Sequence, residues 1–140
     1  DVPANEYVVG YRKTVMKSDE LIVSVRIPKL KAGVSVRSYR VSKRKDLDIA
    51  TLSGGFRLEL GAGNTVKEIR LAYGGMAERT KRAAAVEKFF IGKKWSRGVV
   101  EQAQELIDRD FTPISDARAG AEFRSIAAKN LLMKFWAETQ

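Results

Sequence analysis

The hydrophobic pattern changes its period once along this 140-residue chain, and that change constrains the fold more than any other feature. From residue 19 to residue 75 apolar residues alternate with polar ones, as in a half-buried strand. From residue 79 to residue 138 they recur at three- and four-residue spacing, as in an amphipathic helix. Strands and helices that are segregated along a chain are typical of the α+β class. We therefore predict one α+β domain over residues 1–140, with an antiparallel sheet of three or four strands covered on one face by three helices.

The stretches predicted as strands cover residues 21–27, 34–42, 56–60 and 66–73, after an irregular lead-in over residues 1–18. In the first of them, alternation directs Leu21, Val23, Val25 and Ile27 to the core and leaves Ile22 on the opposite face. Pro28 ends this strand, because proline has no N–H to donate to a ladder.

The predicted strand over residues 34–42 changes phase partway along. Two valines set the alternation at its start, whereas Tyr39 and Val41 set the opposite one. A β-bulge between the two halves would reconcile them. Arg40 would then lie on the face opposite Tyr39 and Val41, and we hypothesise that this face also carries Ile22.

Three helices are predicted after the sheet. The first covers residues 81–90 with Thr80 as its N-cap, and Ser96 could cap the second. The third ends near Trp136, and its inward face is predicted to hold Phe123, Ile126, Ala127, Leu131 and Phe135, with Asn130 as a buried amide.

The composition excludes several classes of functional site. The chain has no cysteine and no histidine, which removes disulfides, thiolate nucleophiles, the usual zinc sites and the commonest general base. No apolar run approaches the roughly 20 residues that span a bilayer, so no membrane segment is expected. No signal peptide is recognised either, so a cytoplasmic location is expected. Because the chain opens at Asp1 without an initiator methionine, we expect a fragment or a processed piece of a longer protein.

The positive charge is concentrated from the middle of the second predicted strand into the loop that follows it. The chain carries a net charge of +9, and residues 37–45 contain only basic charges, at Arg37, Arg40, Lys43, Arg44 and Lys45. Such a concentration predicts an anionic partner, whether nucleic acid, a phosphate-bearing cofactor or an acidic protein surface. Asp46 and Asp48 follow in a loop between strands, and the simplest interpretation pairs them with the neighbouring bases.

Two glycine motifs favour structural roles. Gly61-Ala62-Gly63 begins like a dinucleotide fingerprint but joins two strands, so a hairpin turn is favoured. Gly74-Gly75-Met76 is interpreted as a junction with positive φ between sheet and helices, although it could also let the backbone approach a ligand.

Several segments, in order along nearly the whole chain, carry a family resemblance. They are Gly10–Thr14, Glu20–Pro28, Tyr39–Arg44 with Asp48–Ala50, Gly74–Ala77, Lys81–Ala83 and Asp110–Asp116. With these segments the chain resembles the CO dehydrogenase flavoprotein C-terminal domain family, the last domain of the FAD-binding subunit of molybdenum hydroxylases. Within the family it is most similar to the xanthine dehydrogenase type.

The resemblance implies a domain that closes over an FAD held mainly by upstream domains. It implies FAD contacts at Ile22 and Arg40, and a loop beside the flavin with Arg44, Asp46, Asp48 and Ile49. Molybdopterin and 2Fe-2S clusters would belong to partner domains or subunits, with NAD as the electron acceptor and no nucleic acid or membrane partner. The runner-up is a small basic module that binds nucleic acid or an acidic protein surface, and a third possibility is a domain that only docks a neighbouring subunit.

Overall fold

A computed structural model of the chain describes residues 1–45 and 48–140. Its centre is a four-stranded antiparallel sheet in the order β3-β4-β5-β6. The strands are β3 (Val34–Val41), β4 (Leu52–Leu60), β5 (Val66–Gly74) and β6 (Lys81–Arg82), and the 3-10 turn η1 (Ala62–Asn64) joins β4 to β5. Three of the predicted strands are thus present, and β6 is the fourth.

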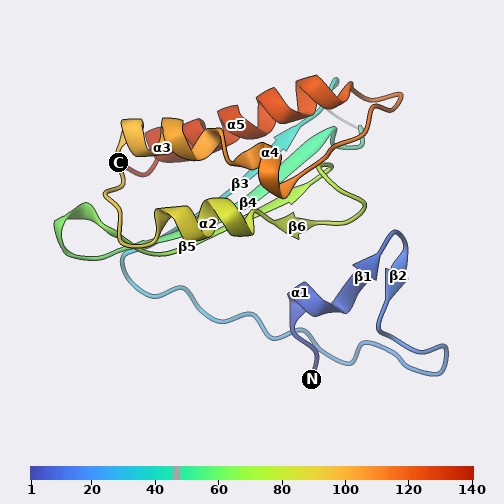
Figure 1. The fold of residues 1–140 in the computed structure, drawn as a ribbon. Coiled ribbons are helices and arrows are strands. Elements are labelled where there is room, and N and C mark those ends of the chain that lie inside the picture. Colours follow the sequence, from blue (N-terminus) through green and yellow to red (C-terminus); the bar gives the residue numbers. More distant parts are fainter. Residues whose placement is uncertain (46–47) are drawn as a thin grey trace.

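The helices cover one face of this sheet, as Figure 1 shows. They are α2 (Ala84–Phe90), α3 (Arg97–Gln104), α4 (Ile107–Asp110) and α5 (Ala121–Ala137). Alternate residues of β4 and β5 are apolar and meet the helices, so that the Phe56 ring lies 4.9 Å from that of Tyr73 and 5.4 Å from that of Phe135, between centroids. This arrangement confirms the α+β prediction.

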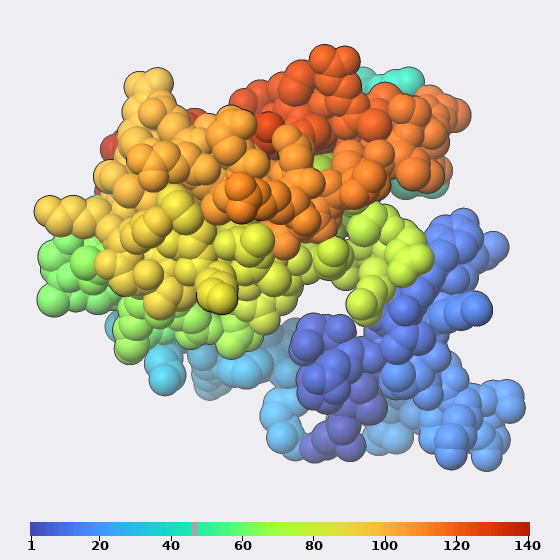
Figure 2. Space-filling model, in the orientation of Figure 1, coloured from blue at the N-terminus to red at the C-terminus, as the bar shows by residue number. Residues whose placement is uncertain are grey.

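The lead-in is more regular than predicted. It forms α1 (Ala4–Tyr7) and a small hairpin of β1 (Val8–Gly10) and β2 (Lys13–Thr14). Figure 2 shows these residues, in blue, as a lobe set apart from the helices and the sheet. The Arg79 Nη1 atom donates a hydrogen bond to the Val8 carbonyl oxygen and so links the lobe to the body.

The strand predicted over residues 21–27 is not formed, and that prediction was wrong. The segment has no regular structure, and the four side chains expected in the core are 75% (Leu21), 88% (Val23), 75% (Val25) and 82% (Ile27) exposed. A strand needs a hydrogen-bonded neighbour as well as an alternating sequence. No described residue supplies that neighbour, because β3 pairs with β4 alone.

The bulge predicted in the next strand is also absent. β3 pairs with β4 without interruption from Val34 opposite Glu59 to Val41 opposite Leu52, and the irregularity lies in β4 between Glu59 and Leu60. The backbone of β3 therefore keeps one phase, and only the type of side chain changes along it. The valines at the start of β3 lie on the face of the sheet that the helices leave open. Arg40 still lies opposite Tyr39 and Val41, as predicted.

The predicted inward face of the last helix needs a correction. Phe123 and Ile126 are each 51% exposed, and Asn130 is exposed as well. The buried residues of α5 are instead Arg124, Ala128, Leu131, Leu132 and Phe135. The helix carries apolar residues on more than one side, so its periodicity does not choose the buried face.

Candidate functional site

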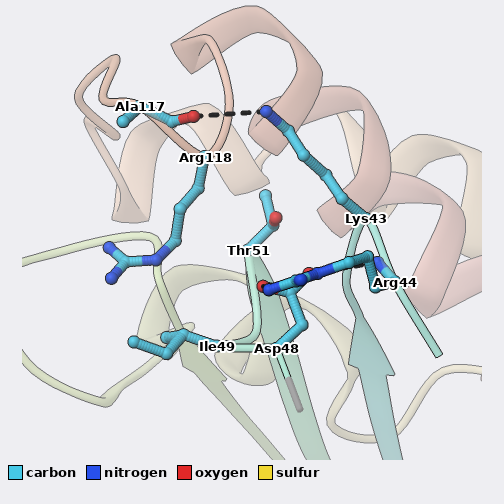
Figure 3. Close-up of a pocket in the computed structure, with 7 residues that line it drawn as sticks. All are labelled: Lys43, Arg44, Asp48, Ile49, Thr51, Ala117 and Arg118. Atoms are coloured by element: carbon cyan, nitrogen blue, oxygen red, sulfur yellow. Dashed lines mark hydrogen bonds and ion pairs between the residues drawn. The ribbon is translucent and has the colours of Figure 1, made fainter. Parts of the chain in front are cut away.

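Two loops that are far apart in the sequence enclose a pocket of about 260 Å³ (Figure 3). One loop joins β3 to β4, and the other precedes α5. The lining residues are Lys43, Arg44, Asp48, Ile49, Thr51, Ala117 and Arg118. The structure therefore brings together three predicted site residues, Arg44, Asp48 and Ile49.

The first wall is organised around the Asp48 carboxylate. The backbone N–H of Arg44 donates to Asp48 Oδ2 at 3.0 Å, and the Arg44 guanidinium lies 4.0 Å from Oδ1. That backbone hydrogen bond, more than the Arg44 charge, holds the pKa of Asp48 below its ordinary value. The pairing of Asp48 with a neighbouring base is as predicted, and it leaves a carboxylate that is ionised at neutral pH.

An apolar side chain and a closed turn complete this wall. Ile49 is 65% exposed although it is large and apolar. Thr51 is buried, and its N–H donates to the Val41 carbonyl oxygen at 2.8 Å, which closes the loop where β4 begins. The loop thus presents an apolar surface beside charged groups, a combination typical of sites for ligands with a ring and a polar edge.

The second wall comes from residues 116–119. The Lys43 ammonium reaches across the pocket and donates to the Ala117 carbonyl oxygen at 3.2 Å. Asp116 Oδ1 accepts from the backbone N–H groups of Arg118 at 2.8 Å and Ala119 at 3.2 Å. The first of these bonds is the main reason that the pKa of Asp116 is lowered. The carboxylate thereby shapes the turn that carries Arg118 into the pocket lining.

Arg118 was missed by the sequence interpretation. No local signal marks it, since it lies about 70 residues after the basic loop that it faces. In Figure 3 the side chains of Arg118 and Ile49 lie on one side of the pocket, and those of Lys43 and Arg44 on the other. The nearest signal for Arg118 in the sequence is the family resemblance, which extends to Asp116, two residues earlier.

Arg40 lines a second hollow beside the first, of about 470 Å³, which shares Lys43 and Arg44 with it. The Arg40 Nη2 atom donates to the Asp48 carbonyl oxygen and so ties the strand to the loop. In the sheet register Arg40 stands opposite Ser53, and Ser53 stands opposite Gly74. The sheet beside Arg40 is therefore built from small residues that leave the guanidinium accessible.

One predicted site residue, Ile22, is not part of this arrangement. Ile22 lies in the irregular segment and is 58% exposed, so the argument that alternation places it on one sheet face with Arg40 was wrong. Its contact with FAD remains a prediction from the resemblance. Asp46 lies outside the described residues.

The comparison with known families decides where the chain belongs. The family model described as the CO dehydrogenase flavoprotein C-terminal domain matches residues 37–139. The chain belongs to this family. The match confirms the predicted resemblance, and it includes every element from β4 to α5 together with most of β3.

Relatives of this flavoprotein domain include xanthine dehydrogenases. The chain is 34% identical to xanthine dehydrogenase 1 of Arabidopsis thaliana, over 96% of this chain and 10% of that protein. It is 33% identical to the xanthine dehydrogenase of Emericella nidulans, over 97% of this chain and 10% of that protein. The chain thus spans about a tenth of the length of these relatives.

The solved structures agree with this assignment. The fold matches a chain of the carbon monoxide dehydrogenase from Hydrogenophaga pseudoflava with a TM-score of 0.86 and 28% identity, over 95% of this chain and 46% of that one. It matches a chain of quinoline 2-oxidoreductase from Pseudomonas putida 86 with a TM-score of 0.84 and 25% identity, over 99% of this chain and 47% of that one.

Proposed function

We propose that this chain is the C-terminal domain of the FAD subunit of a xanthine dehydrogenase-like oxidoreductase. In that subunit it would help to enclose an FAD held mainly by upstream domains. Two findings together support this proposal. The family match covers residues 37–139, and the loop that the resemblance places beside the flavin lines the pocket between the two loops.

The residues of this site suit a flavin. The isoalloxazine offers an apolar face and a polar edge, and FAD also carries a pyrophosphate. The exposed Ile49 side chain suits the ring, whereas the cations of Arg40, Lys43 and Arg118 suit anionic groups. A pocket of about 260 Å³ lies just below the roughly 300–1,000 Å³ typical of whole ligand sites, which supports a site completed by other domains.

The chain's own residues would bind and shield the cofactor. When bound, FAD supplies the electron-transfer chemistry of the enzyme. Ile49 would keep water from an apolar surface, and Arg40, already held by the Asp48 carbonyl oxygen, would present a cation with little loss of conformational freedom. Asp48 would remain ionised and limit the net positive charge beside the cofactor.

The finer parts of the proposal concern the rest of the enzyme. Electrons would arrive from 2Fe-2S clusters and a molybdopterin centre in partner domains or subunits, and NAD would accept them. The location would be cytoplasmic, without a nucleic-acid partner. None of the helices in the described part of the chain combines the length and the apolar character needed to cross a bilayer.

Flavin binding by the complete flavin subunit tests this function. Arg40→Ala should raise the Kd for FAD about tenfold, as expected for the loss of one hydrogen bond to a charged group. Ile49→Asp should raise it at least as much, because it places a carboxylate at the apolar contact. Ile22→Asp, tested separately, checks the contact that rests on the resemblance alone.

The matched control is Arg97→Ala, which removes an exposed arginine of α3, a helix at the opposite end of the molecule from the β3–β4 loop (Figure 1). It should leave the Kd for FAD within about twofold. Unchanged FAD affinity in both the Arg40 and the Ile49 variants would refute the proposed site. Submicromolar oligonucleotide binding with a steep salt dependence would favour the basic interaction module instead.

A further inference from the structure

One charged side chain is buried behind the candidate site and touches three separate segments. Arg124 of α5 is only 4% exposed. Its Nη1 atom donates to the carbonyl oxygens of Thr51 at 2.8 Å and Gly75 at 2.6 Å, and its Nη2 atom donates to Asp116 Oδ1 at 2.8 Å. Burial of a charged group is unfavourable unless hydrogen bonds and an opposite charge compensate it, and these three contacts supply both.

Two of these acceptors belong to the opposite walls of the pocket. Thr51 ends the wall that contains Asp48 and Ile49, and it lines the pocket itself. Asp116 begins the other wall, and its Oδ1 atom also holds the backbone N–H groups of the turn that carries Arg118. One planar guanidinium therefore joins both walls through two of its nitrogens, a geometry that a lysine ammonium does not reproduce.

The third acceptor ties the same guanidinium to the end of the sheet. Gly75 has a φ of +81°, and a Cβ atom there would lie 2.4 Å from the Thr51 carbonyl oxygen and 3.1 Å from Arg124 Nη1. The segment after β5 thus packs directly against the pair of Thr51 and Arg124. This close approach leaves the guanidinium little room to shift between the walls.

The pairing of Arg124 is incomplete in a way that bears on its role. Its Nε atom is buried without a hydrogen-bond partner in the described chain. A buried arginine with an unsatisfied N–H is a poor source of stability, and apolar residues often replace buried ion pairs without loss. The contacts that are made all fix the positions of loops.

We propose that Arg124 is a positioning residue that sets the separation of the two pocket walls, and through them the fit of the pocket to its flavin, without touching the ligand. This inference rests on the proposed function. Lys129, on the same helix, provides the contrast, because its ammonium pairs with Asp108 Oδ2 of α4 at 2.7 Å and belongs to neither wall.

The test uses the complete flavin subunit with Arg124→Met, Arg124→Lys and Asp116→Asn, and with Lys129→Met as the matched control. Hydrogen exchange in the apoprotein reports on the walls, and titration with FAD reports on the pocket. Arg124→Met should speed the exchange of the Arg118 and Ala119 amides and raise the Kd for FAD, each about tenfold. Arg124→Lys should show smaller changes in both amide exchange and FAD affinity, since an ammonium keeps the charge but lacks the planar, forked geometry of a guanidinium.

The controls separate positioning from stability. Lys129→Met should lower the melting temperature but leave the exchange at residues 116–119 and the Kd for FAD within about twofold. If Arg124→Met does not fold, Arg124→Lys decides, because an ammonium keeps the buried charge but does not reproduce the geometry that joins both walls. It should show both the faster exchange at residues 116–119 and the weaker FAD binding.

The outcomes also distinguish this inference from the proposed function. Equal effects of Arg124→Met and Lys129→Met on FAD binding would overturn the positioning role, as would unchanged exchange at residues 116–119. Normal FAD binding in the Arg124 and Asp116 variants, together with losses in the Arg40 and Ile49 variants, would overturn the inference alone. Normal binding in all of these variants would overturn the proposed function as well.

Discussion

Gly75 shows how one residue can be required for two physical reasons. Its φ of +81° costs an L-residue about 1–2 kcal/mol, and an added Cβ would also meet the Thr51 carbonyl oxygen at 2.4 Å. Gly75→Ala should therefore destabilise the chain by more than Gly92→Ala, because Gly92 has a φ of +77° with nothing near its Cβ position. Urea unfolding measures both changes, and equal losses would contradict the close contact.

A third glycine completes this comparison. Gly98 lies within α3 with an ordinary helical φ and nothing near its Cβ position. Gly98→Ala should raise the free energy of unfolding by about 0.5–1 kcal/mol, because alanine loses less conformational entropy in a helix. The glycine pattern after β5 indicated a positive φ correctly, but it could not show that Thr51 and Arg124 lie against it.

The start of α2 shows how a helix takes its cap from a distant part of the chain. The Asp110 carboxylate accepts from the backbone N–H groups of Ala85 at 3.0 Å and Val86 at 3.1 Å. Thr80, the cap predicted from the sequence, precedes β6 instead, because a two-stranded pairing of Lys81–Arg82 with β5 comes before the helix. The local sequence did not contain this information.

Substitution at the two positions distinguishes the caps. Asp110→Ala should lower the free energy of unfolding by about 1 kcal/mol, the typical cost of losing an N-cap side chain. Thr80→Ala should change it by less than about 0.5 kcal/mol, as at an exposed position without such a role. Chemical denaturation measures both, and a larger loss for the threonine variant would restore the sequence interpretation.

The exposed apolar segment over residues 21–27 concerns the molecule as a whole. Its five apolar side chains are between 58% and 88% exposed, and the family model begins only at residue 37. Exposed strand-like sequence of this kind marks a surface that another part of a protein covers. We expect the amides of residues 21–27 to exchange rapidly in the 140-residue chain and slowly in the complete flavin subunit.

Hydrogen exchange followed by mass spectrometry tests this expectation. The amides of β4 supply the internal control, because β4 is paired on both sides and should be protected in both forms. Rapid exchange of residues 21–27 in the complete subunit would show that the segment stays uncovered. The apolar alternation would then have no structural counterpart.

The sequence by itself determined the features that depend on near neighbours. Alternation specified β4 and β5 because their apolar residues must face one core. Helical spacing identified the part of the chain in which the helices lie. The basic loop with Asp48 and Ile49 was identified from local charge and from the family resemblance. These features need only residues a few positions apart.

The tertiary structure decided whatever depends on distant partners. It left residues 21–27 without a neighbouring strand, turned Phe123 of α5 outward and buried Arg124 in its place. It also brought Arg118 to a basic loop about 70 residues earlier. The physical reason is the same for all of these features. Strand pairing, burial and pocket formation depend on which surfaces of the chain meet, whereas a local pattern shows only that a segment has an apolar or charged surface that can be buried or paired.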